Sequence, residues 1–586
     1  MSAIAAKPFQ PKLIHSRELP GTVTSTRGPV HMFTLRSGFD SSFTLYTNLL
    51  IRLEIDREGL HKLFGTRTVD PETGTVGPYE WVTLREFLVA VENCSSGMSR
   101  ELGLQRGALV GIFSKTAMNG AGQTLMACVK DCPSIGTVVQ FEEKIDSKDV
   151  RLARVNNVSL MTLDQLMEIG RANPVETDPP LHDDLCTICY TSGTMGDPKS
   201  VMLTYSNMVA SILCSIEITP LNESDVHLSF LPLAHCFERN VQAHTIAKGG
   251  CIGYYQGDVT KLLEDMAELR LTVFPSVPRL LNRIHDKITQ GVAATGGLKK
   301  LLFDQGYAAK KEYLADGYYT HAFWDRLVFD KRKMILGGRV RYILSGSAPC
   351  RRRIRTHGTA AVVSCAMADM PMTRHVGIPV AGAEICLEDV PYKHYSTRDT
   401  PCTRGEILTR SGHVFKGYYK QPELTNEVLD AAGWFHTGDI GQWNPDGTLM
   451  VIDRKKNICK LSQGEYVSPE RVEGVYGQSP FVAQVFVLGD SFQNYLVGIV
   501  VPDPEYISLC APGNKTLLRV IQEDLRQLAL AAKLLPFERA HKLRLHAEQF
   551  TPENGLATPT FKPKRFELIK YFSDVIDDMY AEQSKL

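Results

Sequence analysis

The sequence of 586 residues has no excess of charge of either sign, because 65 lysines and arginines balance 65 aspartates and glutamates. Without a net positive field to attract phosphates, no nucleic-acid partner is expected. No run of eighteen apolar residues occurs, so we expect no membrane-spanning helix. The fourteen cysteines are scattered and contain no pair of CxxC motifs, which excludes the usual zinc and disulfide frameworks. The remaining composition, 43% hydrophobic and 22% charged, is that of a globular chain.

The spacing of apolar residues predicts alternating strands and helices as far as residue 344. An apolar period near 3.6 predicts a helix over 84–102, and a strand is expected over 109–113. Between 186 and 204 an apolar strand enters a glycine-rich loop and leaves it as a second strand. This alternation indicates α/β layering. The first forty residues are rich in Ser, Thr, Gly and Pro, and they are expected to be irregular.

The pattern changes after Gly441. Asn444-Pro445-Asp446-Gly447 predicts the tight turn of a hairpin, and the charged run Asp453-Arg454-Lys455-Lys456 follows it. The elements expected beyond this run are a helix beginning at Ser468-Pro469-Glu470, strands over 482–488 and 496–501, and a helix over 517–535. We therefore predict a large domain over residues 1–452, a hinge at 453–456 and a smaller α+β domain over 457–586.

The chain ends in Ser584-Lys585-Leu586. A C-terminal S-K-L tripeptide is an address that the peroxisomal import receptor reads. We therefore expect a peroxisomal location, with the import receptor as a partner.

The segment from Tyr190 to Lys199, YTSGTMGDPK, is the most informative stretch. Its small residues allow successive backbone N–H groups to converge on a phosphate and form an anion nest. The hydroxyls of Thr191, Ser192 and Thr194 add donors, and Lys199 adds a positive charge. The GxxxxGK[ST] order of a Walker A loop is absent. A solvated Gly/Ser turn is the alternative interpretation, which a glycine-rich loop alone does not exclude.

These ten residues resemble the phosphate-binding motif YTSGTTGxPKG of the acyl-adenylate-forming, AMP-binding superfamily. The chain departs from that motif at Met195, where the family usually has Thr, and at Ser200, where it usually has Gly. The resemblance continues in order through five further segments, which are 231–235 (LPLAH), 274–279 (FPSVPR), 345–349 (SGSAP), 434–439 (WFHTGD) and 554–565, which contains PTFKPKR.

The resemblance implies a role for each matched residue. Lys562 is the expected adenylation lysine and His235 is expected near the acyl carboxylate, so these two are the candidate catalytic residues. Asp439 is expected to accept hydrogen bonds from the ribose hydroxyls, and Arg454 to bind ribose or phosphate. The remaining positions are Thr191, Ser192, Gly193, Thr194, Gly196 and Lys199 around the phosphates, Gly346, Ser347 and Ala348 beside adenine, Gly464 beside the pantetheine arm, Lys456 at the hinge, and Thr194 again near the Mg²⁺ of Mg-ATP.

Within the superfamily, residues 415–420, 453–465 and 559–565 are similar to the long-chain fatty acyl-CoA synthetase branch. The implied fold is α/β, with a large adenylate-forming domain of layered sheets and helices and a smaller, mobile α+β domain. The implied reaction uses ATP, Mg²⁺ and CoA. A long-chain fatty carboxylate attacks the α-phosphorus, and the CoA thiol then takes the acyl group from acyl-AMP. Because such acids partition into bilayers, peripheral membrane contact is compatible with this reaction, although no basic amphipathic anchor is evident.

Two segments of the family pattern are missing. After Lys115 the chain passes within about ten residues to Leu125, which resembles a much later point of the pattern. After Pro349, residues 350–358, with five basic residues from Arg351 to His357, stand in place of the helix and strand that end in Tyr-Gly-x-Thr-Glu, the family motif for adenine stacking and magnesium binding. The similar sequence Tyr476-Gly477-Gln478-Ser479 lies beyond the hinge, and we interpret it as a helix end in the small domain.

Three functions remain open. The first is a peroxisomal long-chain fatty acyl-CoA ligase. The second is a catalytically impaired acyl- or nucleotide-binding relative that lacks the Tyr-Gly-x-Thr-Glu motif. The third is a peroxisomal ligase for another acid, such as an aryl acid. ATP binding without AMP release would separate the second function from the first, and competition between acids would separate the third.

Overall fold

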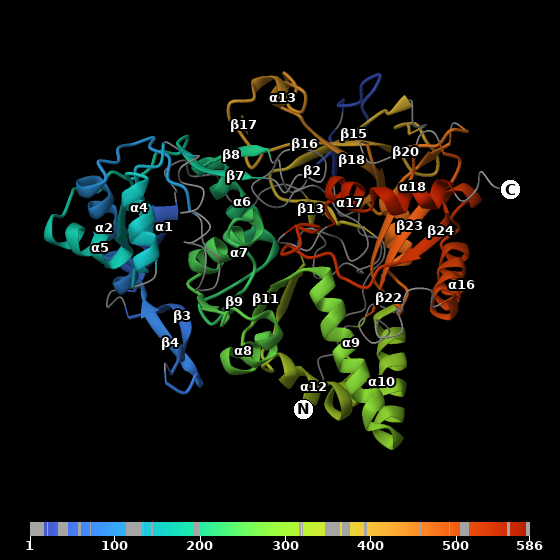
Figure 1. Ribbon diagram of the computed structural model, residues 1–586, viewed down its shortest axis with the longest axis horizontal. Helices are drawn as coiled ribbons and strands as arrows, with labels where there is room; N and C mark the ends of the chain where they lie inside the picture. Colours follow the sequence, from blue (N-terminus) through green and yellow to red (C-terminus); the bar gives the residue numbers. More distant parts are fainter. Residues whose placement is uncertain are drawn as a thin grey trace.

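A computed structural model of the chain describes residues 17–19, 21–32, 45–56, 60–70, 72–112, 132, 134–141, 144–190, 199–315, 318, 320–345, 364–365, 375–391, 395–455, 459–463, 465–490, 493–503, 515–558 and 563–581. These residues form two six-stranded sheets, a three-stranded sheet near the middle of the chain and another near its end (Figure 1). Among the described helices, none combines the length and the low polarity needed to cross a bilayer.

The first six-stranded sheet is mostly parallel. Only the edge strand β4 runs antiparallel to its neighbour. Its core contains Leu228, Met266 and Phe274, all fully buried. In sheet order the strands are β12 (Tyr342–Ser345), β11 (Val273–Ser276), β9 (Val226–Ser229), β10 (Cys251–Tyr254), β3 (Lys62–Val69) and β4 (Val76–Thr83). Parallel strands that leave the sheet at one edge bring their following loops together, so this edge is where a site is expected.

The second six-stranded sheet is antiparallel. Alternate residues of its central strands pack into two clusters, with Ile385, Leu387 and Ile407 in one and Cys386 and Leu408 in the other, so both faces of these strands are buried. In sheet order the strands are β1 (Arg17–Leu19), β2 (Val30–Met32), β15 (Glu384–Glu388), β16 (Arg404–Arg410), β18 (Phe435–Trp443) and β19 (Leu449–Arg454).

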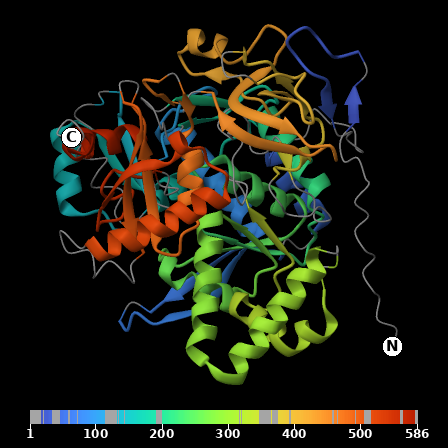
Figure 2. The same cartoon turned by 90° about the vertical axis from the view of Figure 1, so that its right-hand side faces the viewer.

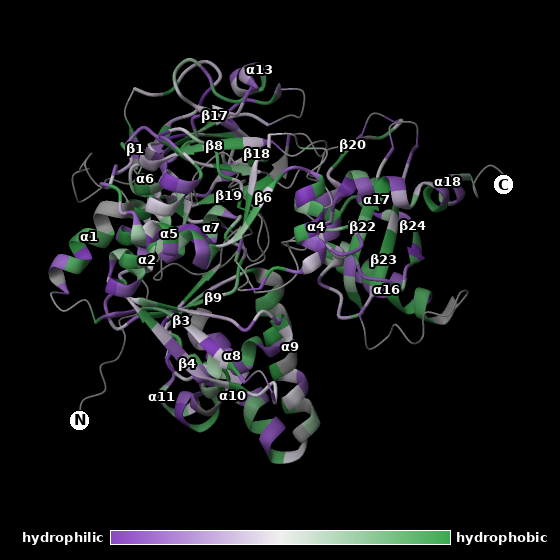
Figure 3. Cartoon of the chain, turned by 60° about the vertical axis from the view of Figure 1, so that its left-hand side comes forward, coloured by the Kyte–Doolittle hydropathy of each residue, from purple (hydrophilic) through white to green (hydrophobic). Residues whose placement is uncertain are grey.

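The three-stranded sheet near the end of the chain has helices on both faces (Figure 2). Its strands are β22 (Val482–Leu488), β23 (Leu496–Pro502) and β24 (Ala540–Leu545), and the first two are strongly hydrophobic (Figure 3). Alternate residues face α14 (Pro469–Tyr476) and α16 (Lys515–Ala531) on one side, and α17 (Arg565–Tyr571) and α18 (Ser573–Ala581) on the other. Both core clusters contain only residues from Leu461 onward.

The remaining elements lie around these sheets. A hairpin sheet comprises β17 (Gly417–Tyr418), β8 (Ser200–Thr204) and β7 (Leu185–Tyr190), and three two-stranded sheets pair β5 (Thr137–Gln140) with β6 (Ser159–Thr162), β13 (Ser364–Cys365) with β14 (Ile378–Pro379), and β20 (Cys459–Lys460) with β21 (Tyr466–Val467). The other main helices are α1 (Leu45–Ile55), α2 (Leu84–Glu101), α4 (Ser147–Val155), α5 (Leu163–Ala172), α6 (Tyr205–Ile218), α7 (Cys236–Ala247), α8 (Leu262–Leu269), α9 (Pro278–Thr295), α10 (Gly297–Ala315) and α13 (Pro422–Asn426).

Most elements predicted from periodicity are confirmed. Helix α2 begins where its capping box places it, with Thr83 and Glu86 each satisfying a backbone N–H of the other. The 444–447 turn joins β18 to β19. Tyr476 ends α14, and its hydroxyl accepts a hydrogen bond from the Ala540 N–H at 2.9 Å. The similar sequence at 476–479 is therefore a helix end, as interpreted.

Three sequence predictions are wrong in part. The strand expected over 109–113 is absent from its described residues, and Leu109 and Ile112 are 61% and 81% exposed. A strand needs a neighbour for its backbone groups, and the described residues offer none there. The first forty residues contain the short strands β1 and β2, which extend the antiparallel sheet. The helix expected to end at 535 stops at Ala531, because Lys533 adopts a left-handed backbone (φ 55°).

Candidate active site

The expected phosphate loop is carried by a two-stranded hairpin. Strands β7 and β8 pair antiparallel, with Tyr190 opposite Ser200. Residues Thr191, Ser192, Gly193, Thr194 and Gly196 lie outside the described residues. Lys199 is described, and its ammonium lies 5.1 Å from the centre of the Tyr418 ring, a cation–π distance. Strand β8 also pairs with β17, so the structure brings the phosphate-loop motif beside the 415–420 motif.

Asp439 lies on β18, next to a bulge in the second sheet. Glu406 of β16 pairs with Ile440, whereas Leu408 pairs with His436, so β18 has two extra residues there. Gly438 has φ of 72°, a conformation that favours glycine. The Thr437 hydroxyl donates to the Ile407 carbonyl at 2.7 Å and accepts from the Asp439 N–H at 3.1 Å. The bulge thus fixes the backbone on both sides of the expected ribose-binding carboxylate, which is fully buried here.

Arg454 is the last residue of β19 and stands opposite Asp439 in the sheet register. The next residue, Lys455, donates its N–H to the Gly438 carbonyl at 2.8 Å. The two motifs expected to contact ribose are therefore adjacent through main-chain pairing. Lys456 and Gly464 lie outside the described residues.

One hydrophobic cluster joins the phosphate hairpin to the strand of Asp439. Val201 and Leu203 of β8 pack with Phe415, Tyr418 and Phe435. The Phe415 and Phe435 rings meet edge to face, with centroids 5.4 Å apart. Because Phe435 begins β18, this cluster sets the distance between the loop expected to hold phosphates and the turn expected to hold ribose.

His235 caps the amino end of α7, and its Nδ1 accepts a hydrogen bond from the Phe237 N–H at 3.2 Å. An accepting Nδ1 requires the neutral ring to carry its proton on Nε2. Helix α7 is tied to the phosphate hairpin, because Arg239 donates to the Thr187 hydroxyl at 3.0 Å and to Cys189 Sγ at 2.7 Å.

The carboxyl edge of the first sheet gathers three of the expected segments. His235 lies shortly after β9, the 274–279 segment includes the end of β11, and Ser345 ends β12. Strands β11 and β12 end in register, with Ser276 opposite Ser345. Gly346, Ser347 and Ala348 follow directly and lie outside the described residues. Segments expected near the acyl group and adenine thus leave one sheet edge together.

Sequence analysis missed a buried ionisable pair behind this edge. His227 of β9 and Glu238 of α7 are both fully buried, with Nε2 and Oε1 2.9 Å apart. Gln242 donates to the same Glu238 oxygen at 3.4 Å. A glutamate three residues after His235, on a buried helix face, was the available signal. The pair fixes α7 against the sheet and so orients the helix that His235 caps.

The loop expected to carry the adenylation lysine is anchored at both ends. The Lys564 N–H donates to the Leu556 carbonyl at 2.9 Å, and Ala557 and Pro563 form an isolated bridge. Arg565 forms an ion pair with Glu473 of α14 at 2.6 Å and donates to the Val487 carbonyl. Lys562 itself lies outside the described residues, as do Ser584, Lys585 and Leu586.

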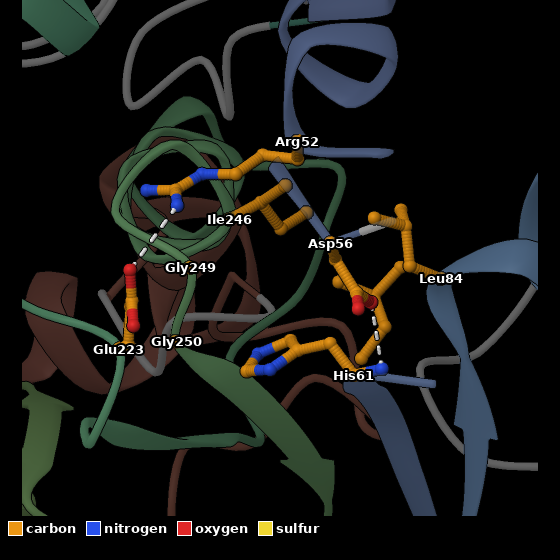
Figure 4. A pocket seen from close by; sticks show the side chains of 9 residues that line it. Arg52, Asp56, His61, Leu84, Glu223, Ile246, Gly249 and Gly250 are labelled. Atoms are coloured by element: carbon orange, nitrogen blue, oxygen red, sulfur yellow. Dashed lines mark hydrogen bonds and ion pairs between the residues drawn. The ribbon is translucent and has the colours of Figure 1, made fainter. Parts of the chain in front are cut away.

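A cavity of about 280 Å³ lies at the opposite, amino-terminal edge of the first sheet (Figure 4). Arg52 and Glu223 face each other across it at 3.8 Å, and Asp56 accepts a hydrogen bond from the His61 N–H at 2.8 Å. The Gly249–Gly250 turn forms its floor. None of the residues expected from sequence lines this cavity, so it is separate from the candidate site.

Comparisons with known proteins agree with this arrangement. The AMP-binding enzyme family matches residues 117–419, more than half of the chain. The peroxisomal long chain acyl-CoA synthetase 6 of Arabidopsis thaliana is 39% identical over 89% of this chain and 84% of its own length. The peroxisomal long chain acyl-CoA synthetase 7 of the same plant is 36% identical, over 99% of this chain and 94% of its own length.

A solved structure shows the same fold. The A-PCP didomain of carboxylic acid reductase from Segniliparus rugosus, in complex with AMP, superposes with a TM-score of 0.73 at 24% identity. The match covers 93% of this chain and 83% of that one. The expected α/β adenylate-forming fold is therefore confirmed.

Part of the alignment with one relative has no counterpart in this chain. The alignment with the second plant relative runs over 666 positions, whereas this chain has 586 residues, so at least 80 positions have no residue of this chain opposite them. That the gaps follow Lys115 and Pro349 stays a prediction. With identity of this degree over nearly its whole length, the chain belongs to the AMP-binding enzyme family and, within it, to the long-chain acyl-CoA synthetases.

Proposed function

We propose that this chain ligates a long-chain fatty acid to CoA with ATP, through an acyl-adenylate. The observation that carries the proposal is the single hydrophobic cluster that holds the phosphate hairpin against the strand of Asp439. It supports one continuous nucleotide site, with the phosphate loop at one end and the ribose carboxylate at the other. Relatives named as long chain acyl-CoA synthetases support a long-chain fatty acid as the acid and CoA as the acyl acceptor.

In the proposed reaction, this chain's residues overcome repulsion between two anions. A fatty carboxylate and a triphosphate repel each other, so positive and hydrogen-bonding groups must gather where charge develops. We assign this role to Lys199 and Lys562, with the 191–198 loop around the phosphates. Asp439 and Arg454 hold the ribose. His235 lies near the acyl carboxylate and presents a proton on Nε2. Gly464 lets the pantetheine arm pass for the second step.

Magnesium is part of the proposal only as Mg-ATP. Among the described residues, one cluster, Glu388, Glu406 and His436, has ligand atoms within 4.8 Å of one another. The Lys455 ammonium already lies 2.6 Å from Glu406 Oε2, so this cluster does not fit a metal ion. Mg²⁺ usually binds through substrate phosphates and few protein groups, and Thr194 is the residue that would approach it. Bound there, it would neutralise phosphate charge.

The test is AMP release by the purified chain with ATP, Mg²⁺, CoA and palmitate. We expect release that depends on palmitate and falls at least a hundredfold in Lys562→Ala. Lys570→Ala, an exposed lysine on α17, should keep the parent rate and serves as the control. An excess of benzoate should leave the palmitate rate unchanged, and competition by benzoate would point to an aryl-acid ligase. Equal rates in both lysine variants would refute the assignment of Lys562.

A second candidate function is an acyl- or nucleotide-binding relative without catalysis. The observation that favours it is that at least 80 positions of the alignment with one relative have no residue of this chain opposite them. We predict that these positions include the adenine-stacking and magnesium-binding motif. ATP binding measured by calorimetry, together with no AMP release from a folded chain, would establish this function in place of ligation.

We also propose that residues 1–452 and 457–586 are separate domains joined at Lys456. The separate core clusters from Leu461 onward support this division. A rotation of the small domain between the half-reactions would carry Lys562 away and admit CoA. Lys456→Pro should then spare acyl-AMP formation and slow thioester formation at least tenfold. Equal slowing of both half-reactions would contradict the hinge role.

We propose a peroxisomal location, because two plant relatives are named as peroxisomal enzymes. The import receptor would then be a partner through Ser584-Lys585-Leu586. A fluorescent protein fused ahead of residue 1 should report punctate peroxisomal signal, and removal of the last three residues should disperse it. Punctate signal that survives the removal would show that another segment directs the chain.

Peripheral contact with a lipid surface completes the proposal. The α9–α10 hairpin projects from the body of the molecule (Figure 1). Near its tip, Leu298 and Leu301 are 70% and 54% exposed, beside Lys299 and Lys300. Leu298→Glu should reduce co-sedimentation with phosphatidylcholine–phosphatidylserine vesicles several-fold, whereas Leu181→Glu, at 63% exposure, should not. Equal binding by both variants would exclude the hairpin.

A further inference from the structure

The carboxylate of Glu406 lies at the centre of a polar cluster beneath the Asp439 bulge. Its side chain is only 2% exposed. One oxygen, Oε1, accepts the Gly438 N–H at 3.1 Å. The other, Oε2, receives the Lys455 ammonium at 2.6 Å and lies 3.4 Å from His436 Nδ1. A buried carboxylate is tolerated only when such partners compensate its lost hydration.

A neighbouring carboxylate, Glu388, shares His436 with Glu406 but has a different basic partner. Glu388 of β15 pairs with Arg27 at 2.9 Å and lies 3.7 Å from His436 Nδ1. Arg27 also pairs with Asp430 at 2.9 Å. The cluster is therefore a network of alternating charges in which Lys455 and Arg27 supply the positive groups. Of these two glutamates, Glu406 is the one that contacts both Gly438 of the bulge and Lys455, the residue before the predicted hinge.

We propose that Glu406 is a positioning residue for nucleotide binding, which closes the Gly438 bulge and tethers it to Lys455. This role rests on the proposed function, because it assumes that Asp439 holds the ribose. One oxygen fixes the backbone immediately before Asp439, and the other holds the side chain of the residue that follows Arg454. The carboxylate thereby sets the separation of the two residues expected at the ribose.

The charge state of Glu406 supports this role. Although burial raises it, hydrogen bonds from His436 and Lys455 hold the pKa of Glu406 below its ordinary value. The carboxylate is therefore ionised at neutral pH, when it can accept from Gly438 and Lys455 together. A glutamine at this position could still accept from the Gly438 N–H but would lose the charge that holds Lys455.

The test compares three variants by ATP affinity and by the KM values for ATP and palmitate. Glu406→Ala should raise the KM for ATP about tenfold and leave the KM for palmitate within twofold. Glu406→Gln should be intermediate, since it keeps one of the two contacts. Glu388→Gln, the matched control on the next strand, should leave both values unchanged. A merely structural carboxylate would shift both KM values together, or neither.

A double variant tests the tether itself. Lys455→Met should weaken ATP binding because it leaves Glu406 ionised and uncompensated, and adding Glu406→Gln should restore part of the loss, since the buried charge is then gone. If the losses of ATP affinity from the two substitutions simply multiply in the double variant, Glu406 and Lys455 act independently and the proposed tether is wrong.

A readout without nucleotide separates this inference from the proposed function. In Glu406→Ala, backbone amide hydrogen exchange should accelerate in a peptide covering 435–441 while remaining unchanged in β22 and β23. Unchanged exchange over 435–441 would overturn the positioning role even in an active enzyme. If exchange is faster in Glu406→Ala but the parent chain binds no ATP, the proposed ribose site is refuted. The contact of Glu406 with the bulge would then be structural alone.

Discussion

At the residue scale, Arg565 shows how a conserved-looking spacing can conceal a structural role. The segment PTFKPKR pointed to Lys562 through its resemblance to a family motif, whereas the structure gives Arg565 of the same segment a structural role. Its guanidinium pairs with Glu473 and lies 4.9 Å from the centre of the Phe486 ring. Both side chains of the ion pair are mostly buried. The arginine therefore attaches the loop of the expected catalytic lysine to α14 and β22.

We expect Arg565→Ala to destabilise the chain by about 3 kcal/mol, because it leaves Glu473 buried without its partner. Burial raises the pKa of Glu473, and Arg565 opposes that shift, so the unpaired carboxyl should take up a proton. Acyl-AMP formation should fall more than thioester formation from added acyl-AMP, because only adenylation needs Lys562. Urea unfolding and the two half-reactions measure these effects. Arg565→Lys, which keeps the charge, should recover most of the stability, and equal losses in both half-reactions would contradict the anchor.

Three buried histidines should make stability depend on pH. Burial lowers the pKa of His31, His244 and His413 to about 4, from 6.5. Between these values the unfolded chain binds protons that the folded chain does not, so stability is full above pH 6.5 and falls toward pH 4. Each histidine contributes roughly 3 kcal/mol to the decrease in the free energy of unfolding over this pH range. Urea unfolding at pH 7.5 and 5.0 should show the fall, and His413→Leu should reduce it. An unchanged pH dependence in that variant would refute the assignment.

The residue types of the site could be read from sequence, but their geometry could not. The resemblance of residues 434–439 to a family motif pointed to Asp439 as the expected ribose-binding residue. That the turn is a bulge, closed by Glu406 from a strand some thirty residues earlier, depends on sheet register. Register is set by packing across strands rather than by local spacing. His227 and Glu238 were missed for the same reason.

At the element scale, prediction succeeded where one helix or hairpin carries its own signals. Helix α2 has a capping box, and the 444–447 turn has its glycine at φ of 78°. It failed at 109–112, where an apolar run has strand composition but no strand beside it among the residues that the structure describes. A strand is stable only as part of a sheet, so composition alone could not reveal a missing neighbour.

Helices α2 and α5 cross at two glycines, which allows their backbones to approach. A Cβ at Gly170 would clash with the Asn93 carbonyl oxygen, and one at Gly97 would clash with the Leu166 carbonyl oxygen. Gly170→Ala should therefore destabilise the chain, although the same change favours an isolated helix by about 1 kcal/mol. Gly474→Ala in α14, where an added Cβ meets nothing within 4 Å, should stabilise instead. Thermal unfolding of both variants measures these effects. A change of unfolding temperature in the same direction in both variants would refute the close crossing of the two helices.

At the scale of the whole molecule, the family fold is kept although an alignment with one relative leaves at least 80 positions without a residue of this chain. The match to the AMP-bound didomain covers 93% of this chain, so the sheets that frame the site are retained. Near the predicted first gap, apolar surface is left exposed. Strands β5 and β6 form a parallel pair with no third strand among the described residues, and Leu109, Val110 and Ile112 are more than half exposed. Parallel strands are normally covered on both faces.

Restoring the absent segment should therefore stabilise the molecule. We would insert between Lys115 and Leu125 the corresponding residues of the peroxisomal long chain acyl-CoA synthetase 7 of Arabidopsis thaliana. Covering three exposed apolar side chains contributes up to about 1.5–3 kcal/mol each. Thermal unfolding should then shift upward by several degrees, and binding of an apolar dye such as ANS should fall.

The control is an insert of equal length made only of Gly and Ser. It restores chain length without apolar side chains, so it should neither raise the unfolding temperature nor reduce dye binding. Equal unfolding temperatures and equal dye binding with the two inserts would show that residues 109–112 are not stabilised by the apolar side chains of the inserted segment. A stabilised chain that still releases no AMP would place the loss of catalysis at the second predicted gap, after Pro349, because that gap is the one predicted to remove the adenine-stacking and magnesium-binding motif.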